Sequence, residues 1–174
     1  VPKVTYATVR INVHNIGILN APKINCIQTD DSDNITIFWT PIPDPWGSFI
    51  EYGVYSVQDG LIASLPDINA DNYTINSITG ANEYYLSVQS GICGNTKRYS
   101  DTLSNIFLSI NNPNNGTALL SWNNPSNNYI PDFNSYTHIY REYPPGTLTL
   151  IDSVEYNVNS YKDTIDICEA FLKY

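Results

Sequence analysis

The chain has 174 residues, which is room for one or two domains, and 42% of them are hydrophobic. Its formal net charge of −9 argues against nucleic acid and anionic membranes as partners, because cationic patches supply that binding. No apolar stretch approaches the roughly 18 residues of a membrane-spanning helix, so we expect no direct membrane insertion. The abundance of Tyr (14 residues) and Asn (22 residues) indicates an all-β protein with many loops.

The first 19 residues predict one strand and a linker. Val9, Ile11 and Val13 alternate with polar residues, which marks one buried face and one wet face. A lone strand cannot bury its apolar face, so we expect residues 1–19 to be the last strand of a preceding β domain plus its linker. The chain begins with Val and contains no Met, so we expect a mature or internal stretch of a longer protein.

Residues 20–105 predict a first complete module. Short β-forming runs alternate there with turn signals such as Gln58-Asp59-Gly60, a spacing typical of an antiparallel β-sandwich. No segment of useful length has helical periodicity. The expected strands are 23–27, 35–40, 49–57, 61–65, 72–78, 84–89 and 98–105.

Residues 106–174 repeat part of this pattern as a second module. Trp39 and Trp122 lie 83 residues apart, and each is followed by a proline and then by a Tyr-containing strand. Repeats of this length are small domains rather than solenoid units. The expected strands are 106–110, 118–122, 135–141, 148–154 and one near Tyr161, after which the chain stops before the equivalents of the last strands. The sequence therefore predicts tandem antiparallel β-sandwiches, the second one incomplete.

Several residues carry a family resemblance. An apolar-x-Trp run ending at Trp39 is followed by Pro41 and by Tyr-x-Val-Tyr, and Ile78 precedes Tyr84 by six residues. This arrangement resembles fibronectin type III domains, over residues 21–105 in full and 106–174 in part. The resemblance implies that Trp39 and Trp122 are core residues and that Tyr84 is the tyrosine corner, whose hydroxyl ties down the preceding loop. The expected core is Ile37, Trp39, Tyr52, Val54, Ile75, Tyr84, Leu86, Val88, Leu120, Trp122, Ile139 and Leu150.

A narrower resemblance begins at the end of the first module. Cys-Gly-Asn at 93–95 precedes Ser-Asn at 104–105, with Leu-Ser-Trp at 120–122 and Ile-Tyr-Arg at 139–141 downstream. This arrangement resembles tandem modules in large surface proteins of gliding bacteria, which are secreted by the type IX system and end in a sorting domain. The resemblance implies an extracellular location at the bacterial cell surface. Any sorting domain would lie beyond Tyr174.

The three cysteines are too far apart for a zinc ribbon or a thioredoxin motif. We favour a disulfide between Cys26 and Cys93, with Cys168 unpaired because its partner would lie in the missing part of the second module. Closing a loop of 67 residues would stabilise the fold by about 4 kcal/mol on the chain-entropy model and requires an oxidising compartment. Two buried free thiols are the alternative.

Three short segments fit the Asp-Ser/Thr-apolar acceptor pattern of O-glycans in the same bacterial phylum, which makes Thr102, Ser153 and Thr164 candidate glycosylation sites. Chance matches are expected for so short a pattern. Asn34, Asn72 and Asn115 begin N-glycan sequons, which would matter only in a eukaryotic secretory host.

No catalytic constellation is apparent in the sequence. His14 and His138 are isolated, no nucleophile-elbow motif frames a serine, and no glycine-rich phosphate loop occurs. We therefore predict neither enzymatic activity nor a cofactor.

The acidic turn formed by Asp30, Asp31 and Asp33 is a weak calcium candidate, since it clusters oxygen ligands. It lacks the spacing and terminal Glu of an EF-hand loop, and a solvated β-turn is the alternative.

The proline-rich loop around Trp46 is the remaining candidate for ligand contact. An exposed Trp on a stiff loop suits a sugar platform or a protein hot spot, although Trp46 can equally fold back over the sandwich end. Tyr129 occupies the corresponding loop of the second module.

The leading functional hypothesis is a non-catalytic structural and adhesive module, whose partners are neighbouring domains of the same long chain and a cell-surface protein or glycan. A second hypothesis is an accessory carbohydrate-binding or spacer module of a secreted hydrolase. A third is strand donation: Val4–Val13 of a neighbouring molecule fills the groove of the incomplete second module and builds a head-to-tail fibre. The alternative to this third hypothesis is that Tyr174 is only a proteolytic boundary.

Overall fold

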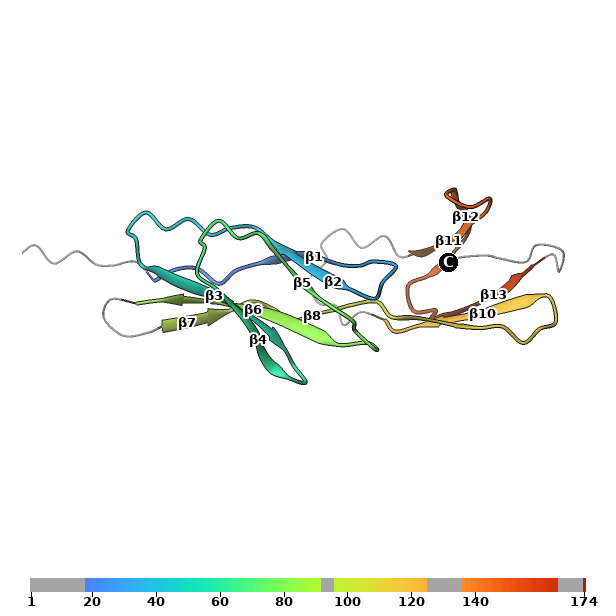
Figure 1. Ribbon diagram of the computed structural model, residues 1–174, viewed down its shortest axis with the longest axis horizontal. Coiled ribbons are helices and arrows are strands. Elements are labelled where there is room, and N and C mark those ends of the chain that lie inside the picture. The colour runs from blue at the N-terminus through green and yellow to red at the C-terminus, as the bar shows by residue number, and fades with distance from the viewer. Residues whose placement is uncertain (1–17, 92–95, 125–135, 166–173) are drawn as a thin grey trace, which may run out of the picture.

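The computed structural model describes residues 18–91, 96–124, 136–165 and 174. Within these ranges the regular structure consists only of β-strands, and every strand pair is antiparallel (Figure 1). The two modules follow one another along the long axis of the molecule. The all-β, antiparallel fold class expected from the sequence is confirmed.

The first module is a sandwich of two sheets. One sheet has the strand order β1-β2-β5, and the other has the order β4-β3-β6-β7 with the short strand β8 added on β6. This division of sequential strands between two facing sheets is that of fibronectin type III-like sandwiches. The strands are β1 (Ile24–Thr29), β2 (Ile35–Trp39), β3 (Phe49–Ser56), β4 (Gly60–Leu65), β5 (Asn72–Ile75), β6 (Glu83–Ser90), β7 (Thr96–Tyr99) and β8 (Leu103–Ser104).

The core of the first module follows from period-two alternation on its central strands. β2 buries every second side chain, and Trp39 at its end meets the ring of Tyr52 edge-on at a centroid distance of 5.7 Å. Each fully buried side chain of this size stabilises the fold by roughly 1.5–3 kcal/mol relative to exposure. The buried apolar residues are Leu19, Ile35, Ile37, Trp39, Ile42, Tyr52, Val54, Tyr84, Leu86 and Val88, and Ile75 packs against them half-buried.

The hydroxyl that ties loops together belongs to Tyr52 and not, as predicted, to Tyr84. The Tyr52 hydroxyl accepts a hydrogen bond from the Ile42 amide (2.9 Å) and donates one to the Ile68 carbonyl (3.2 Å), so it joins two separate loops. Tyr84 is completely buried on β6, and its hydroxyl has no hydrogen-bond partner among the described residues. Tyr84 is thus a buried core residue, as predicted, but no hydrogen bond from its hydroxyl to the preceding loop is found among the described residues.

The segment predicted as one strand over 98–105 is two strands, β7 and β8. Ser100 lies between them, where its amide donates to the Leu86 carbonyl and its hydroxyl accepts from the Leu86 amide, both at 2.8 Å. The Ser100 hydroxyl thus takes the place of a backbone carbonyl as acceptor for the Leu86 amide, and this interrupts the regular backbone pairing with β6.

The second module repeats the first as far as its fifth strand. One sheet has the order β9-β10-β13, matching β1-β2-β5, and the hairpin β11-β12 matches β3-β4. Counterparts of β6, β7 and β8 are absent from the described part of the chain. The strands are β9 (Leu108–Asn111), β10 (Thr117–Trp122), β11 (Tyr136–Glu142), β12 (Leu148–Glu155) and β13 (Ser160–Thr164).

The core of the second module is small. Leu120, Trp122 and Ile139 are buried in it, as the sequence pattern predicts. The prediction for Leu150 is wrong, because this side chain is 49% exposed. A bulge between Ile139 and Tyr140 places Leu150 opposite Tyr140 on the outer face, and Ile151 packs on the core instead.

Candidate functional site

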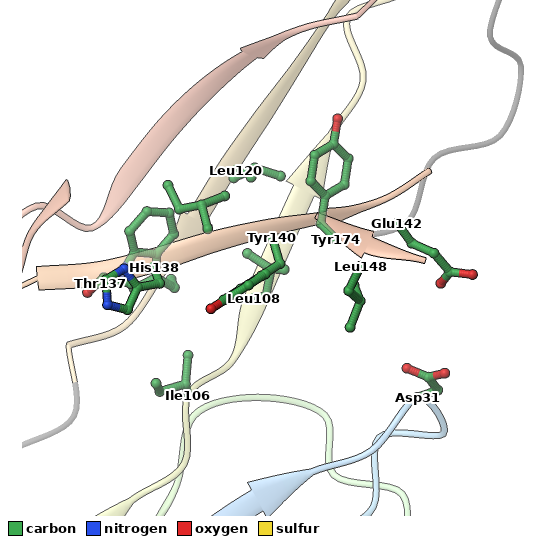
Figure 2. Close-up of a pocket in the computed structure, with 12 residues that line it drawn as sticks. Asp31, Ile106, Leu108, Leu120, Thr137, His138, Tyr140, Glu142, Leu148 and Tyr174 are labelled. Carbon is green, nitrogen blue, oxygen red and sulfur yellow. The ribbon is translucent and has the colours of Figure 1, made fainter. Parts of the chain in front are cut away.

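An apolar groove of about 410 Å³ opens in the second module and lies along β11 and the segment leading into β9 (Figure 2). We call it the second-module groove. Its apolar lining comes from both sheets: Ile106, Leu108, Leu120, Trp122, Ile139 and Leu148. In the first module the corresponding space is filled by β6, whose Tyr84, Leu86 and Val88 are at most 1% exposed.

One edge of β11 is open. β11 pairs with β12 on one side, and its other side has no strand partner within the described ranges. Its counterpart β3 is paired on both sides, by β4 and β6. Backbone N–H and C=O groups along an open edge are a template for another strand.

An ion pair joins the two sheets beside the groove. The Arg141 guanidinium on β11 donates to the Asp163 carboxylate on β13 at 3.0 Å, and the Tyr174 hydroxyl donates to the same oxygen at 2.8 Å. Burial, together with the hydrogen bond to Asp163, raises the pKa of Tyr174 far above its usual range. The carboxylates of Glu142 and Asp31 are among the groups that line the groove (Figure 2).

Two asparagines hold the joint between the modules. Asn105 is 2% exposed, and its side chain accepts from the Asn82 amide at 2.7 Å and donates to the Gly80 carbonyl at 3.2 Å. Asn123 on the other side accepts from the Phe107 amide at 2.7 Å and donates to the Asn105 carbonyl at 2.8 Å. Sequence reasoning missed these roles, because asparagine is so common in this chain that no single one stands out.

Trp46 is 59% exposed, so it does not fold back over the sandwich end. The Asp44 carboxylate organises its loop by accepting hydrogen bonds from the amides of Phe49 (2.7 Å) and Trp46 (3.3 Å) and from the Ser48 hydroxyl (3.1 Å). Burial opposes ionisation of Asp44, but these donors outweigh it and lower its pKa. Tyr129, the predicted parallel, lies outside the described residues.

The acidic turn is a β-turn held by hydrogen bonds to its own residues and to the segment after β5. The Asp30 carboxylate accepts hydrogen bonds from the Asn34 side chain and from the amides of Asn34 and Ser32, and these bonds lower its pKa. Across the described ranges no cluster of three His, Cys, Asp or Glu side chains can hold a metal ion. The calcium candidate formed by Asp30, Asp31 and Asp33 thus gains no support, since the turn's own donors occupy the Asp30 oxygens.

Cys26 is an exposed free thiol on the outer face of β1. The structure thus does not contain the predicted disulfide with Cys93. Strand β1 turns its Cys26 side chain away from the core, which also excludes the buried-thiol alternative at this position. Cys93, Cys168 and His14 lie outside the described residues.

The candidate modification sites differ in accessibility. Thr102 and Thr164 are exposed, whereas Ser153 is half-buried and its hydroxyl lies 2.7 Å from Nδ1 of His138. Among the sequon asparagines, Asn72 and Asn115 are exposed and Asn34 is half-buried. Glycosylation at any of them stays a prediction.

A tyrosine cluster on the outer face of the first module was not anticipated. The rings of Tyr55 and Tyr85 stack at 4.9 Å, and Tyr99 meets both edge-on. The Lys97 ammonium donates to the Tyr55 hydroxyl at 3.3 Å. The three tyrosines come from β3, β6 and β7, so only the strand register brings them together.

No protein-family model matches the sequence, and no curated protein matches it. Solved structures with fibronectin type III domains are similar over most of the chain. The FN1–FN3 domains of chicken CNTN1 align with a TM-score of 0.34 and 13% identity, over 83% of this chain and 56% of that one. The central fibronectin-III array of RIM-binding protein aligns with a TM-score of 0.36 and 16% identity, over 84% of this chain and 57% of that one. A two-domain fibronectin type-III segment from chicken tenascin aligns with a TM-score of 0.29 and 13% identity, over 84% of this chain and 82% of that one.

The chain therefore spans a little over half the length of the first two of these structures. Their likeness concerns the fold alone. By its own strand order the chain is a tandem fibronectin type III-like β-sandwich protein. Within the described ranges no helical segment has the length and apolar character needed to cross a bilayer.

Proposed function

We propose that the chain is a non-catalytic structural and adhesive part of a secreted protein at the bacterial cell surface, where stiff tandem sandwiches hold binding parts away from the cell. The observation that carries this proposal is the joint. β8 ends at Ser104 and β9 begins at Leu108, so three residues separate strands of different modules.

The Asn105 side chain bonds this short connection to the first module, and the Asn123 side chain bonds it to the second. Flexible linkers let domains reorient freely, whereas a short, bonded connection restricts them. A restricted joint suits a spacer that transmits force or keeps a fixed reach. The surface location is supported by the resemblance to modules of large bacterial surface proteins.

Small-angle X-ray scattering tests the joint. We expect the natural chain and the control Asn111→Ala, which changes an exposed asparagine of β9, to scatter as one extended shape. The double variant Asn105→Ala, Asn123→Ala should scatter as a flexible ensemble. A natural chain that already requires a flexible ensemble would contradict the spacer role.

Protease treatment of intact cells tests the location. We expect an external protease to remove the chain while a cytoplasmic marker protein survives. Full protection of the chain until the cells are lysed would contradict a surface location.

A further inference from the structure

The turn between β9 and β10 contains the one Asn-Gly pair of this asparagine-rich sequence, Asn115-Gly116. The carboxamide carbon of an asparagine lies within reach of the backbone nitrogen of the next residue, and attack by that nitrogen closes a succinimide ring. Glycine has no Cβ to obstruct this approach and gives the backbone the freedom that the ring requires. The pair therefore combines an electrophile with the least hindered backbone nucleophile.

The fold leaves this pair accessible. Asn115 is exposed, and Gly116 is half-buried with a φ of +77°. The pairing of β10 with β13 begins at Thr117, so Gly116 lies outside that ladder, although its carbonyl accepts a hydrogen bond from the Ile165 amide at 2.8 Å. No strand pairing therefore has to break before the Gly116 nitrogen reacts.

The first residue of β10 places a donor on the electrophile. The Thr117 hydroxyl donates to Oδ1 of Asn115 at 2.7 Å. Thr117 is only 9% exposed, so its place in the strand fixes the position of this hydroxyl. When a nucleophile attacks the carboxamide carbon, negative charge develops on Oδ1, and a donor already in place stabilises that charge.

We propose that Asn115 is a site of spontaneous deamidation, with Gly116 as the nucleophile and the Thr117 hydroxyl as the stabilising donor. Hydroxide removes the Gly116 amide proton, the nitrogen bonds to Cγ of Asn115, and the Cγ–Nδ2 bond breaks. The departing nitrogen takes a proton from water and leaves as ammonia, which regenerates hydroxide. Water then opens the succinimide: cleavage at Cγ gives aspartate, and cleavage at the main-chain carbonyl carbon gives isoaspartate.

The product changes the chain directly before the central strand of a sheet. Either product adds a negative charge, and isoaspartate also lengthens the main chain by one carbon. β10 lies between β9 and β13, and the Gly116 carbonyl holds the Ile165 amide just after β13. Deamidation thus alters the end of the module where these strands meet. Because ammonia is lost to solvent, the converted fraction rises with the age of the molecule.

Peptide mapping by mass spectrometry, on the 174-residue chain incubated at neutral and at alkaline pH, tests the proposal. Asn111, Asn112 and Asn114 lie close by and serve as internal controls, because none of them precedes a glycine. We expect Asn115 to convert at least about tenfold faster than any of the three. The rate should rise with pH, since a base removes the amide proton.

Two variants test the part that the fold contributes. Thr117→Val keeps the β-branched shape and removes the hydroxyl, so the Asn115 rate should fall by about threefold to tenfold, the worth of one hydrogen bond. The control Thr117→Ser keeps the hydroxyl and should react at close to the natural rate. In concentrated urea the contact is lost, so the natural chain and Thr117→Val should convert at the same rate.

An Asn115 rate no higher than that of its neighbours would overturn the proposal, and this comparison needs no variant. An unchanged rate in folded Thr117→Val, an equally slow Thr117→Ser, or a difference that persists in urea would remove the Thr117 hydroxyl from it. The inference is independent of the structural role proposed above, because its readout is a covalent change at one residue.

Discussion

Removal of the Tyr52 hydroxyl is expected to destabilise the first module by about 2–4 kcal/mol. Tyr52→Phe deletes two hydrogen bonds, each with a net contribution of about 0.5–1.5 kcal/mol, and leaves the Ile42 amide and the Ile68 carbonyl without their partner. Where the group left behind is buried and unsatisfied, the cost is about 1–3 kcal/mol instead of that net contribution, hence the upper part of the range. For a module of this size, a loss of 2 kcal/mol lowers Tm by roughly 8–16 °C.

Tyr84→Phe is the matched control for this prediction. It removes the same atom from a ring that is equally buried, but this hydroxyl has no hydrogen-bond partner among the described residues. Its stability should stay within about 0.5 kcal/mol of the natural chain or increase, because an unsatisfied buried group is removed. Urea unfolding followed by tryptophan fluorescence measures both changes. Equal losses for the two variants, or a negligible loss for Tyr52→Phe, would refute the assignment of the loop tie to Tyr52.

Three further outcomes are expected. Burial raises the pKa of both Tyr52 and Tyr84, so the contribution of these two rings to stability should be constant below about pH 10, where tyrosines of the unfolded chain ionise, and should fall as the pH rises further. Unfolding midpoints that do not fall across alkaline pH would contradict the burial of the two hydroxyls. Gly53→Ala should cost about 1–3 kcal/mol, since its Cβ would lie 2.7 Å from both Ser87 Oγ and Tyr55 Cε2, and an unchanged unfolding midpoint would count against the tight packing beneath Tyr55. Trp46→Ala should abolish retention on a polysaccharide array while leaving Tm unchanged, because the ring is exposed; undiminished retention would remove Trp46 as the adhesive contact.

The candidate site illustrates a limit of pattern reading. The exposure of Trp46 was one of two alternatives, because sequence alone cannot show whether a loop side chain points outward or folds back. The Asp44 carboxylate decides this by bonding to the loop's own amides. The tyrosine cluster was not expected, since Tyr55, Tyr85 and Tyr99 come together only when three strands adopt a particular register.

The sequence by itself determined the fold class, most strands and most of the core. Alternating apolar residues on β2, β3 and β6 can bury one face only as strands, so Trp39, Val54 and Leu86 had to face inward. The tertiary structure alone decided the rest. The Tyr52 hydroxyl ties two loops because both cross above it, and a bulge turns Leu150 outward in place of Ile151. The groove likewise exists only where β11 and β9 come near each other. These features depend on contacts between residues distant in the chain, on which local periodicity carries no information.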